Sequence, residues 1–169
     1  MKYDIAQVRA LRAFAYFYMV RFWGDVPLVT YSYDNGSFPF MPRTDAQTVL
    51  GYVKAELIAA IKDLPYQYGT QANLYYGSYG SEWQGKLLNK LSAYSVLAHV
   101  YAWEGNYAET ETYSAFIINH ADEINAKYTS ILDLTSETGL FYSGATVKSS
   151  RILGFNFAHN DNEATQSGH

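Results

Sequence analysis

The chain of 169 residues contains no cysteine and only 4 prolines. Without cysteine, neither a disulfide nor a thiolate metal site can form, although this absence does not fix the compartment. The formal net charge is −4, which argues against nucleic acid as a partner, because phosphate binding needs a basic face. No apolar run reaches the roughly 18 residues that a transmembrane helix needs, and the start of the chain lacks the apolar run of a signal peptide.

Motifs that carry chemistry are also missing. There is no His-Glu-x-x-His, no Gly-x-Ser-x-Gly and no phosphate-binding loop. Glycoside hydrolysis needs two opposed carboxylates, and nothing in the sequence pairs Asp25, Asp34, Glu82 or Glu104. His99 lies between apolar neighbours, which favours a packed or hydrogen-bonded histidine over a metal ligand. We therefore expect no catalysis, no metal and no cofactor.

Aromatic side chains are abundant instead. The chain has 17 tyrosines, and aromatic residues make up 17% of it, with 49% hydrophobic and 17% charged residues. This composition is typical of one globular domain with a core. Tyrosine and tryptophan offer flat faces with a polar edge, so they suit surfaces that bind sugars or proteins, and they also fill helix–helix cores.

Hydrophobic periodicity predicts four helices, over residues 4–23, 45–64, 86–104 and 107–121. The first helix is apolar on nearly every face from Ala13 to Val20, so we expect it to be buried on most sides. Asp4 is its expected N-cap, and Gly24 is expected just after its C-terminus.

The second predicted helix has the clearest apolar stripe, and Thr44 or Asp45 is its expected cap. The stripe consists of Val49, Val53, Leu57, Ala60, Ile61 and Leu64. Pro65 ends this helix. Between the helices, residues 24–43 form an inserted loop, and residues 66–85 form a long tyrosine-rich loop. Residues 123–169 are expected to be a loop region with a short strand over residues 151–158.

Pairs of these helices resemble repeats. Residues 93–122 are similar to a tetratricopeptide repeat, with Gly105 at the turn, although Thr110 replaces the expected small alanine. We predict a mainly α fold of tetratricopeptide-like hairpins in an α-α superhelix, forming a single domain over residues 1–169. Its hairpins span residues 4–65, split by the inserted loop, and residues 86–122.

The first helix and the turn after it carry a family resemblance. Residues 9–29 are RALRAFAYFYMVRFWGDVPLV, and this stretch resembles the SusD/RagB family. Further matches follow in the family's order. They are Pro-Arg-Thr-Asp at 42–45, Asp63-Leu64-Pro65, Leu88-Asn89-Lys90-Leu91, Gly105-Asn106-Tyr107 and Ser150-Arg151-Ile152-Leu153-Gly154-Phe155.

The resemblance implies binding without catalysis. Members of this family are lipid-anchored proteins of the outer membrane at the cell surface. They capture oligo- or polysaccharides, and some capture peptides, for a SusC-like TonB-dependent transporter. They are about three times longer than this chain, so the resemblance implies an internal fragment without the family's lipidated cysteine and its large C-terminal half. Any membrane contact would come through that absent lipid anchor.

The 66–85 loop offers the side-chain mixture that sugars need, because aromatic faces stack on sugar rings and polar groups bond the hydroxyls. From composition and place alone, the candidate ligand-binding residues are Asn73, Tyr75, Tyr76, Tyr79, Glu82 and Trp83. Alternatively, these rings pack the loop onto the scaffold. Two other functions stay open: a scaffold that binds protein segments only, and an all-helical carbohydrate-active enzyme.

Overall fold

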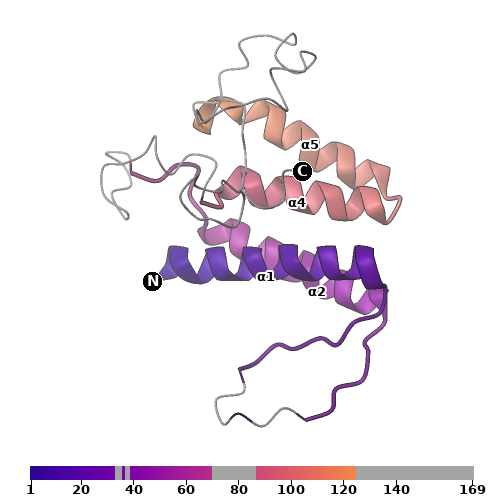
Figure 1. Ribbon diagram of the computed structural model, residues 1–169. Helices are drawn as coiled ribbons and strands as arrows, with labels where there is room; N and C mark the ends of the chain where they lie inside the picture. The colour runs from indigo at the N-terminus through magenta and orange to yellow at the C-terminus, as the bar shows by residue number, and fades with distance from the viewer. Residues whose placement is uncertain (33–35, 37–38, 70–86, 125–169) are drawn as a thin grey trace, which may run out of the picture. The chain divides into compact units, whose positions relative to one another are not determined.

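A computed structural model describes residues 1–32, 36, 39–69 and 87–124 of the chain (Figure 1). The chain divides into two compact units. The first unit contains Met1–Pro65 and Leu88–His120, and the second contains Tyr66–Leu87 and Ala121–His169. The predicted strand at 151–158 and most of the tyrosine-rich loop lie outside the described residues.

The helices of the first unit are α1 (Lys2–Trp23), α2 (Ala46–Asp63), α4 (Lys90–Trp103) and α5 (Tyr107–Asn119). They form a row in chain order, with α1 packed on α2, α2 on α4 and α4 on α5, and α1 also contacts α4 (Figure 1). The second unit contributes a short 3-10 helix, Ala121–Ile124, to the described residues. The predicted mainly α fold is confirmed, and each of the four predicted helices forms.

The core of the first unit begins between α1 and α2. The predicted stripe of α2 is buried along its whole length, and Val53 and Leu57 are fully buried. The facing side of α1 presents small side chains that let the two helices approach closely. The buried residues on this side are Ala6, Ala10, Ala13, Phe17 and Val20. Each fully buried leucine or valine here stabilises the fold by about 1.5–3 kcal/mol.

The helix ends follow local side-chain chemistry. Asp45 caps α2, because its Oδ1 accepts a hydrogen bond of 2.9 Å from the Thr48 backbone N–H. Asn89 and Ser92 form a reciprocal capping box at the start of α4, so this helix begins four residues later than predicted. The prediction of Asp4 as the α1 cap is wrong. The helix starts at Lys2, and Asp4 lies inside its first turn, where a carboxylate still favours the positive end of the helix dipole.

Contacts between the two ends of the segment that joins α1 to α2 hold these ends together, and we call them the closed base of the inserted loop. Gly24 ends α1 with a φ of 67°, a left-handed conformation that favours glycine. Val26 and Thr44 then pair in an isolated antiparallel bridge, with N–O distances of 3.2 and 2.9 Å. The Asp25 carboxylate accepts a 2.9 Å hydrogen bond from the Ala46 N–H, so this side chain connects the turn after α1 to the start of α2.

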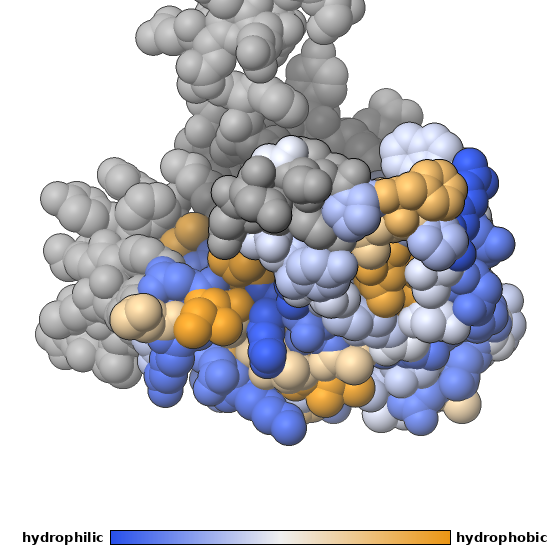
Figure 2. Space-filling view, turned by 90° about the horizontal axis from the view of Figure 1, so that it is seen from below, coloured by the Kyte–Doolittle hydropathy of each residue, from blue (hydrophilic) through white to orange (hydrophobic). Residues whose placement is uncertain are grey.

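Two expectations about burial are wrong. The side of α1 that faces away from α2 is open, and the exposed fractions of Val8 and Phe22 reach 62% and 72%. His99 is exposed rather than packed, because its position on α4 falls on the solvent side although its sequence neighbours are apolar. In Figure 2, hydrophobic side chains accordingly reach the surface between hydrophilic ones.

Candidate functional surface

The sequence-predicted ligand residues, from Asn73 to Trp83, lie outside the described residues. Their proposed role therefore stays a prediction. The surface that the structure does describe is aromatic as well, and it is built from helices rather than from a loop. It comprises a ladder of rings between α4 and α5, an ion pair beside the ladder, and a cation-centred cluster at the end of α1.

The aromatic ladder consists of Tyr94, Tyr101, Tyr113, Phe116 and His120. Each of its side chains is half-buried. The ring centroids of Tyr94 and Phe116 are 4.2 Å apart, and those of Phe116 and His120 are 3.9 Å apart with nearly parallel planes. Tyr101 stacks on Tyr113 at 5.4 Å. The rings meet because Tyr94 and Tyr101 are seven residues apart on one face of α4, opposite the matching face of α5.

Two tyrosines of the ladder, Tyr94 and Tyr113, are poor acid–base groups at neutral pH. Burial raises the pKa of Tyr94, with a smaller contribution from the neighbouring Tyr113. Burial also raises the pKa of Tyr113, and Tyr101 and Glu109 add to this effect. Their hydroxyls therefore stay protonated at pH 7, so they can donate hydrogen bonds but do not provide a phenolate.

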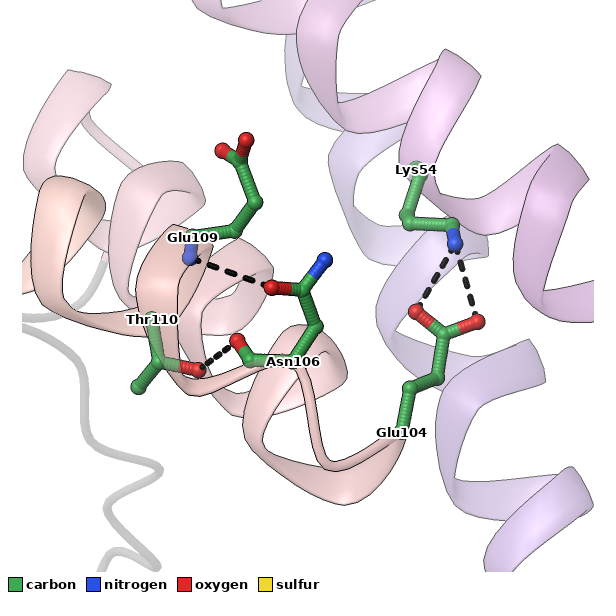
Figure 3. A network of polar contacts seen from close by, with 5 residues as sticks. All are labelled: Lys54, Glu104, Asn106, Glu109 and Thr110. Atoms are coloured by element: carbon green, nitrogen blue, oxygen red, sulfur yellow. Dashed lines mark hydrogen bonds and ion pairs between the residues drawn. The ribbon is translucent and has the colours of Figure 1, made fainter.

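An ion pair joins α2 to the end of α4, beside the ladder. The Lys54 ammonium lies 2.8 and 2.7 Å from the two carboxylate oxygens of Glu104 (Figure 3), and 5.1 Å from the ring centroid of Tyr101. Asn106 caps α5 next to this pair, and the Thr110 hydroxyl donates to the Asn106 carbonyl (Figure 3). Glu104 is thus committed to an interhelical ion pair, which is a structural use of a candidate carboxylate.

A cation lies among rings at the C-terminal end of α1. The Arg21 guanidinium is 5.4 Å from the ring centroid of Phe17, 5.2 Å from that of Tyr18 and 5.3 Å from that of Trp103 on α4. Each such contact contributes about 0.5–1 kcal/mol at an exposed site. Trp103 is 53% exposed, so the cluster presents flat aromatic area to solvent.

A second, partly buried charge contact ties α1 to α2. Arg12 Nη2 donates to Glu56 Oε2 at 2.6 Å, and this hydrogen bond raises the pKa of the Arg12 guanidinium. The guanidinium also lies 5.6 Å from the ring centroid of Tyr52. Like the Lys54–Glu104 pair, this contact fixes one helix against its neighbour.

Sequence reasoning missed these contacts because their partners are far apart in the chain. Lys54 and Glu104 are separated by 50 residues, and Arg12 and Glu56 by 44. The two residues of each pair meet only because their helices pack against each other. Within the part of the chain that the structure describes, no group of histidine, aspartate or glutamate side chains could hold a metal ion, and no helix is long and apolar enough to span a bilayer.

Comparison with known proteins identifies the family to which the chain belongs. No protein-family model and no curated protein matches the chain, but solved structures do. A SusD superfamily protein from Bacteroides thetaiotaomicron VPI-5482 is 86% identical, with a TM-score of 0.79, over 92% of this chain and 34% of its own. Surface glycan-binding protein A from Bacteroides uniformis is 25% identical, with a TM-score of 0.54, over 67% of this chain and 23% of its own. A laminarin binding SusD-like protein is 22% identical, with a TM-score of 0.54, over 83% of this chain and 29% of its own, and it shares the fold.

The row of packed helices defines the molecule as a mainly α protein. The chain belongs to the SusD superfamily, in agreement with the resemblance of residues 9–29. It spans about a third of the length of the 86%-identical solved protein.

Proposed function

We propose that the chain is part of a glycan-binding protein that serves an outer-membrane polysaccharide uptake complex. The observation that carries this proposal is the match at 86% identity to a SusD superfamily protein. Two other matched structures bear the names of a carbohydrate binding protein from Bacteroides fragilis and a laminarin binding protein. The protein would capture an oligo- or polysaccharide without cleaving it, and a lipid anchor outside this chain would hold it at the cell surface.

The two parts of the chain would then have different tasks. The helices of the first unit would form the scaffold and the contact with a SusC-like TonB-dependent transporter. The tyrosine-rich loop would supply rings such as Tyr76 and Trp83 for stacking on sugar faces. The described surface supports the scaffold role, because its carboxylates Glu56 and Glu104 are both used in ion pairs between helices.

Native affinity electrophoresis of the full reading-frame product, through gels that contain different polysaccharides, tests the proposal. We expect one glycan to retard the parent protein, and the Trp83→Ala and Tyr76→Ala variants to migrate freely. Tyr107→Ala is the matched control, since this tyrosine is exposed on the helical unit and lies outside the aromatic clusters described above. If all variants are retarded equally, glycan binding stands but the loop assignment is wrong. If no glycan retards the parent, a scaffold that binds protein segments becomes the better explanation. Release of sugar product from any glycan would contradict the non-catalytic role.

A further inference from the structure

Among the described residues, Arg21 contacts a neighbouring helix without a carboxylate partner. Its guanidinium lies 5.3 Å from the ring centroid of Trp103 on α4, and its other aromatic contacts are with two rings of α1. Arg12 and Lys54 also join two helices, but each of them pairs with a glutamate. The charge of Arg21 is therefore not neutralised by the helices that the structure describes around it.

The carboxylates nearest to Arg21 and Trp103 in the sequence are used elsewhere. Asp25 accepts a 2.9 Å hydrogen bond from the Ala46 N–H, and Glu104 holds the Lys54 ammonium at 2.7 Å. Arg21 itself is exposed. A guanidinium can bind a carboxylate through two parallel N–H groups while its flat face rests on an aromatic ring. Arg21 can therefore receive a carboxylate from outside the chain.

Two exposed side chains of α4 extend the surface beside Arg21. Trp103 and His99 are four residues apart, so they lie on adjacent turns of one helix face, with about 5–6 Å between their Cβ atoms. Both are exposed, and 53% of Trp103 is open to solvent. The indole offers a flat apolar face, and the imidazole can take part in hydrogen bonds. One cation, one flat ring and one polar ring thus lie together at the surface.

This combination matches a sugar ring that carries a carboxylate. The C–H face of a pyranose stacks on an indole, a carboxylate pairs with a guanidinium, and a sugar hydroxyl bonds an imidazole. A neutral sugar would leave the charge of Arg21 unpaired. An acidic peptide would pair with Arg21, but its aspartate or glutamate side chain offers Trp103 no flat C–H face.

We propose that Arg21, His99 and Trp103 form a binding site for a uronic acid residue of a glycan, and we call it the acidic-sugar site. It belongs to the first unit, whereas the candidate ligand residues of the tyrosine-rich loop belong to the second. The proposal rests on the proposed function in glycan capture and adds the chemical class of a ligand.

Isothermal titration calorimetry of the full reading-frame product tests the proposal. The acidic probes are oligosaccharides of galacturonic, glucuronic and mannuronic acid. Each is used as the free acid and as its methyl ester, which keeps the ring and the hydroxyls but removes the charge. Oligosaccharides of glucose and xylose are the neutral probes. The variants are Arg21→Gln and Trp103→Ala. Lys62→Gln removes an exposed cation from the last turn of α2 and is the matched control, and circular dichroism checks that each variant is folded.

We expect at least one uronic acid oligosaccharide to bind about tenfold more tightly as the acid than as the ester, because hydrogen bonds between charged groups are strong. Arg21→Gln should weaken binding of the acid about tenfold and leave binding of the ester unchanged, since the ester lacks the group that Arg21 recognises. Trp103→Ala should weaken binding of both forms, and Lys62→Gln should weaken neither.

The other outcomes overturn the acidic-sugar site in distinguishable ways. Equal weakening of acid and ester by Arg21→Gln would mean that the arginine acts on the fold and not on a carboxylate. If only the neutral probes bind, or if Arg21→Gln leaves binding of the acid intact, the site is wrong while glycan capture stands. If no oligosaccharide binds, the proposed function fails as well. Binding of polyglutamate that Arg21→Gln abolishes, without binding of any uronic acid probe, would identify a contact surface for proteins instead.

Discussion

The hydroxyl of Tyr16 fastens the loop after α1, and its removal tests this account of the fold. The hydroxyl donates to the Val29 carbonyl at 3.0 Å and accepts from the Val29 N–H at 2.7 Å. Tyr16 is 8% exposed, and its ring also meets Tyr52 edge-on at 6.0 Å. Tyr16→Phe keeps the ring and this packing but leaves both backbone groups of Val29 without their partner. Each hydrogen bond contributes about 0.5–1.5 kcal/mol, and Val29 is only half-buried, so water recovers part of the loss.

We therefore expect Tyr16→Phe to cost about 1.5 kcal/mol, which lowers the melting temperature by about 3–6 °C for a chain of this size. The more specific measurement is hydrogen exchange. A loss of about 1.4 kcal/mol corresponds to a tenfold change in an equilibrium, so the Val29 amide, which loses its partner, should exchange about tenfold faster. Tyr107→Phe, at a position that is 73% exposed, is the control and should change neither quantity. An unchanged exchange rate of the Val29 amide in Tyr16→Phe would refute the role of this hydroxyl.

Two substitution pairs and one single substitution provide further tests of the fold. Gly51→Ala should stabilise the protein by about 0.5–1 kcal/mol, because Gly51 is inside α2 and a Cβ there meets nothing within 4 Å. Gly24→Ala should destabilise it by about 1 kcal/mol, because Gly24 has a φ of 67°. Urea unfolding should show changes of opposite sign in the free energy of unfolding, and changes of the same sign would contradict the backbone argument. Leu57→Ala, at a fully buried position, should lower the free energy of unfolding by about 3 kcal/mol. Ile58→Ala, where the side chain is 42% exposed, should lower it by less than about 1 kcal/mol. Similar losses in calorimetry would disprove the assignment of the α2 faces. Hydrogen bonds from Thr48 lower the pKa of Asp45, so this carboxylate stabilises the fold above its unfolded pKa, and the contribution disappears as the pH falls through the lower folded pKa. Asp45→Asn should flatten that part of the acid unfolding curve. An unaltered curve would show that the cap does not titrate with folding.

The sequence was most informative where one helix face is clearly apolar. The α2 stripe from Val49 to Leu64 is buried as predicted, because periodicity reports directly on which side of a helix avoids water. It was least informative for α1, since apolar residues on every face do not say which sides have a neighbour in this chain. The prediction that His99 is packed was wrong for a related reason, because the residues beside it in the sequence lie on other sides of the helix.

The polar contacts between helices escaped prediction altogether. Nothing in the local sequence distinguishes Lys54 or Glu104 from a solvent-exposed charge, because the pair forms only after α2 and α4 have packed. The same is true of Tyr16, whose partner Val29 lies in an irregular segment. The predicted ligand residues around Tyr76 and Trp83 stay a prediction from composition, and the electrophoresis experiment decides their role.

The closed base of the inserted loop has a consequence for how such proteins diverge. Three contacts fix the two ends of the segment independently of what lies between them. They are the backbone pairing of Val26 with Thr44, the hydrogen bond from the Ala46 N–H to the Asp25 carboxylate, and the hydrogen bonds of the Tyr16 hydroxyl with Val29. Doubling the length of a loop whose ends are held costs only about 0.6 kcal/mol in closure entropy. Residues 30–43 are therefore a place where insertions can accumulate without disturbing the register of α1 and α2. Homologous chains should vary most in length there, and a peptide tag introduced into this segment should leave the helical row intact.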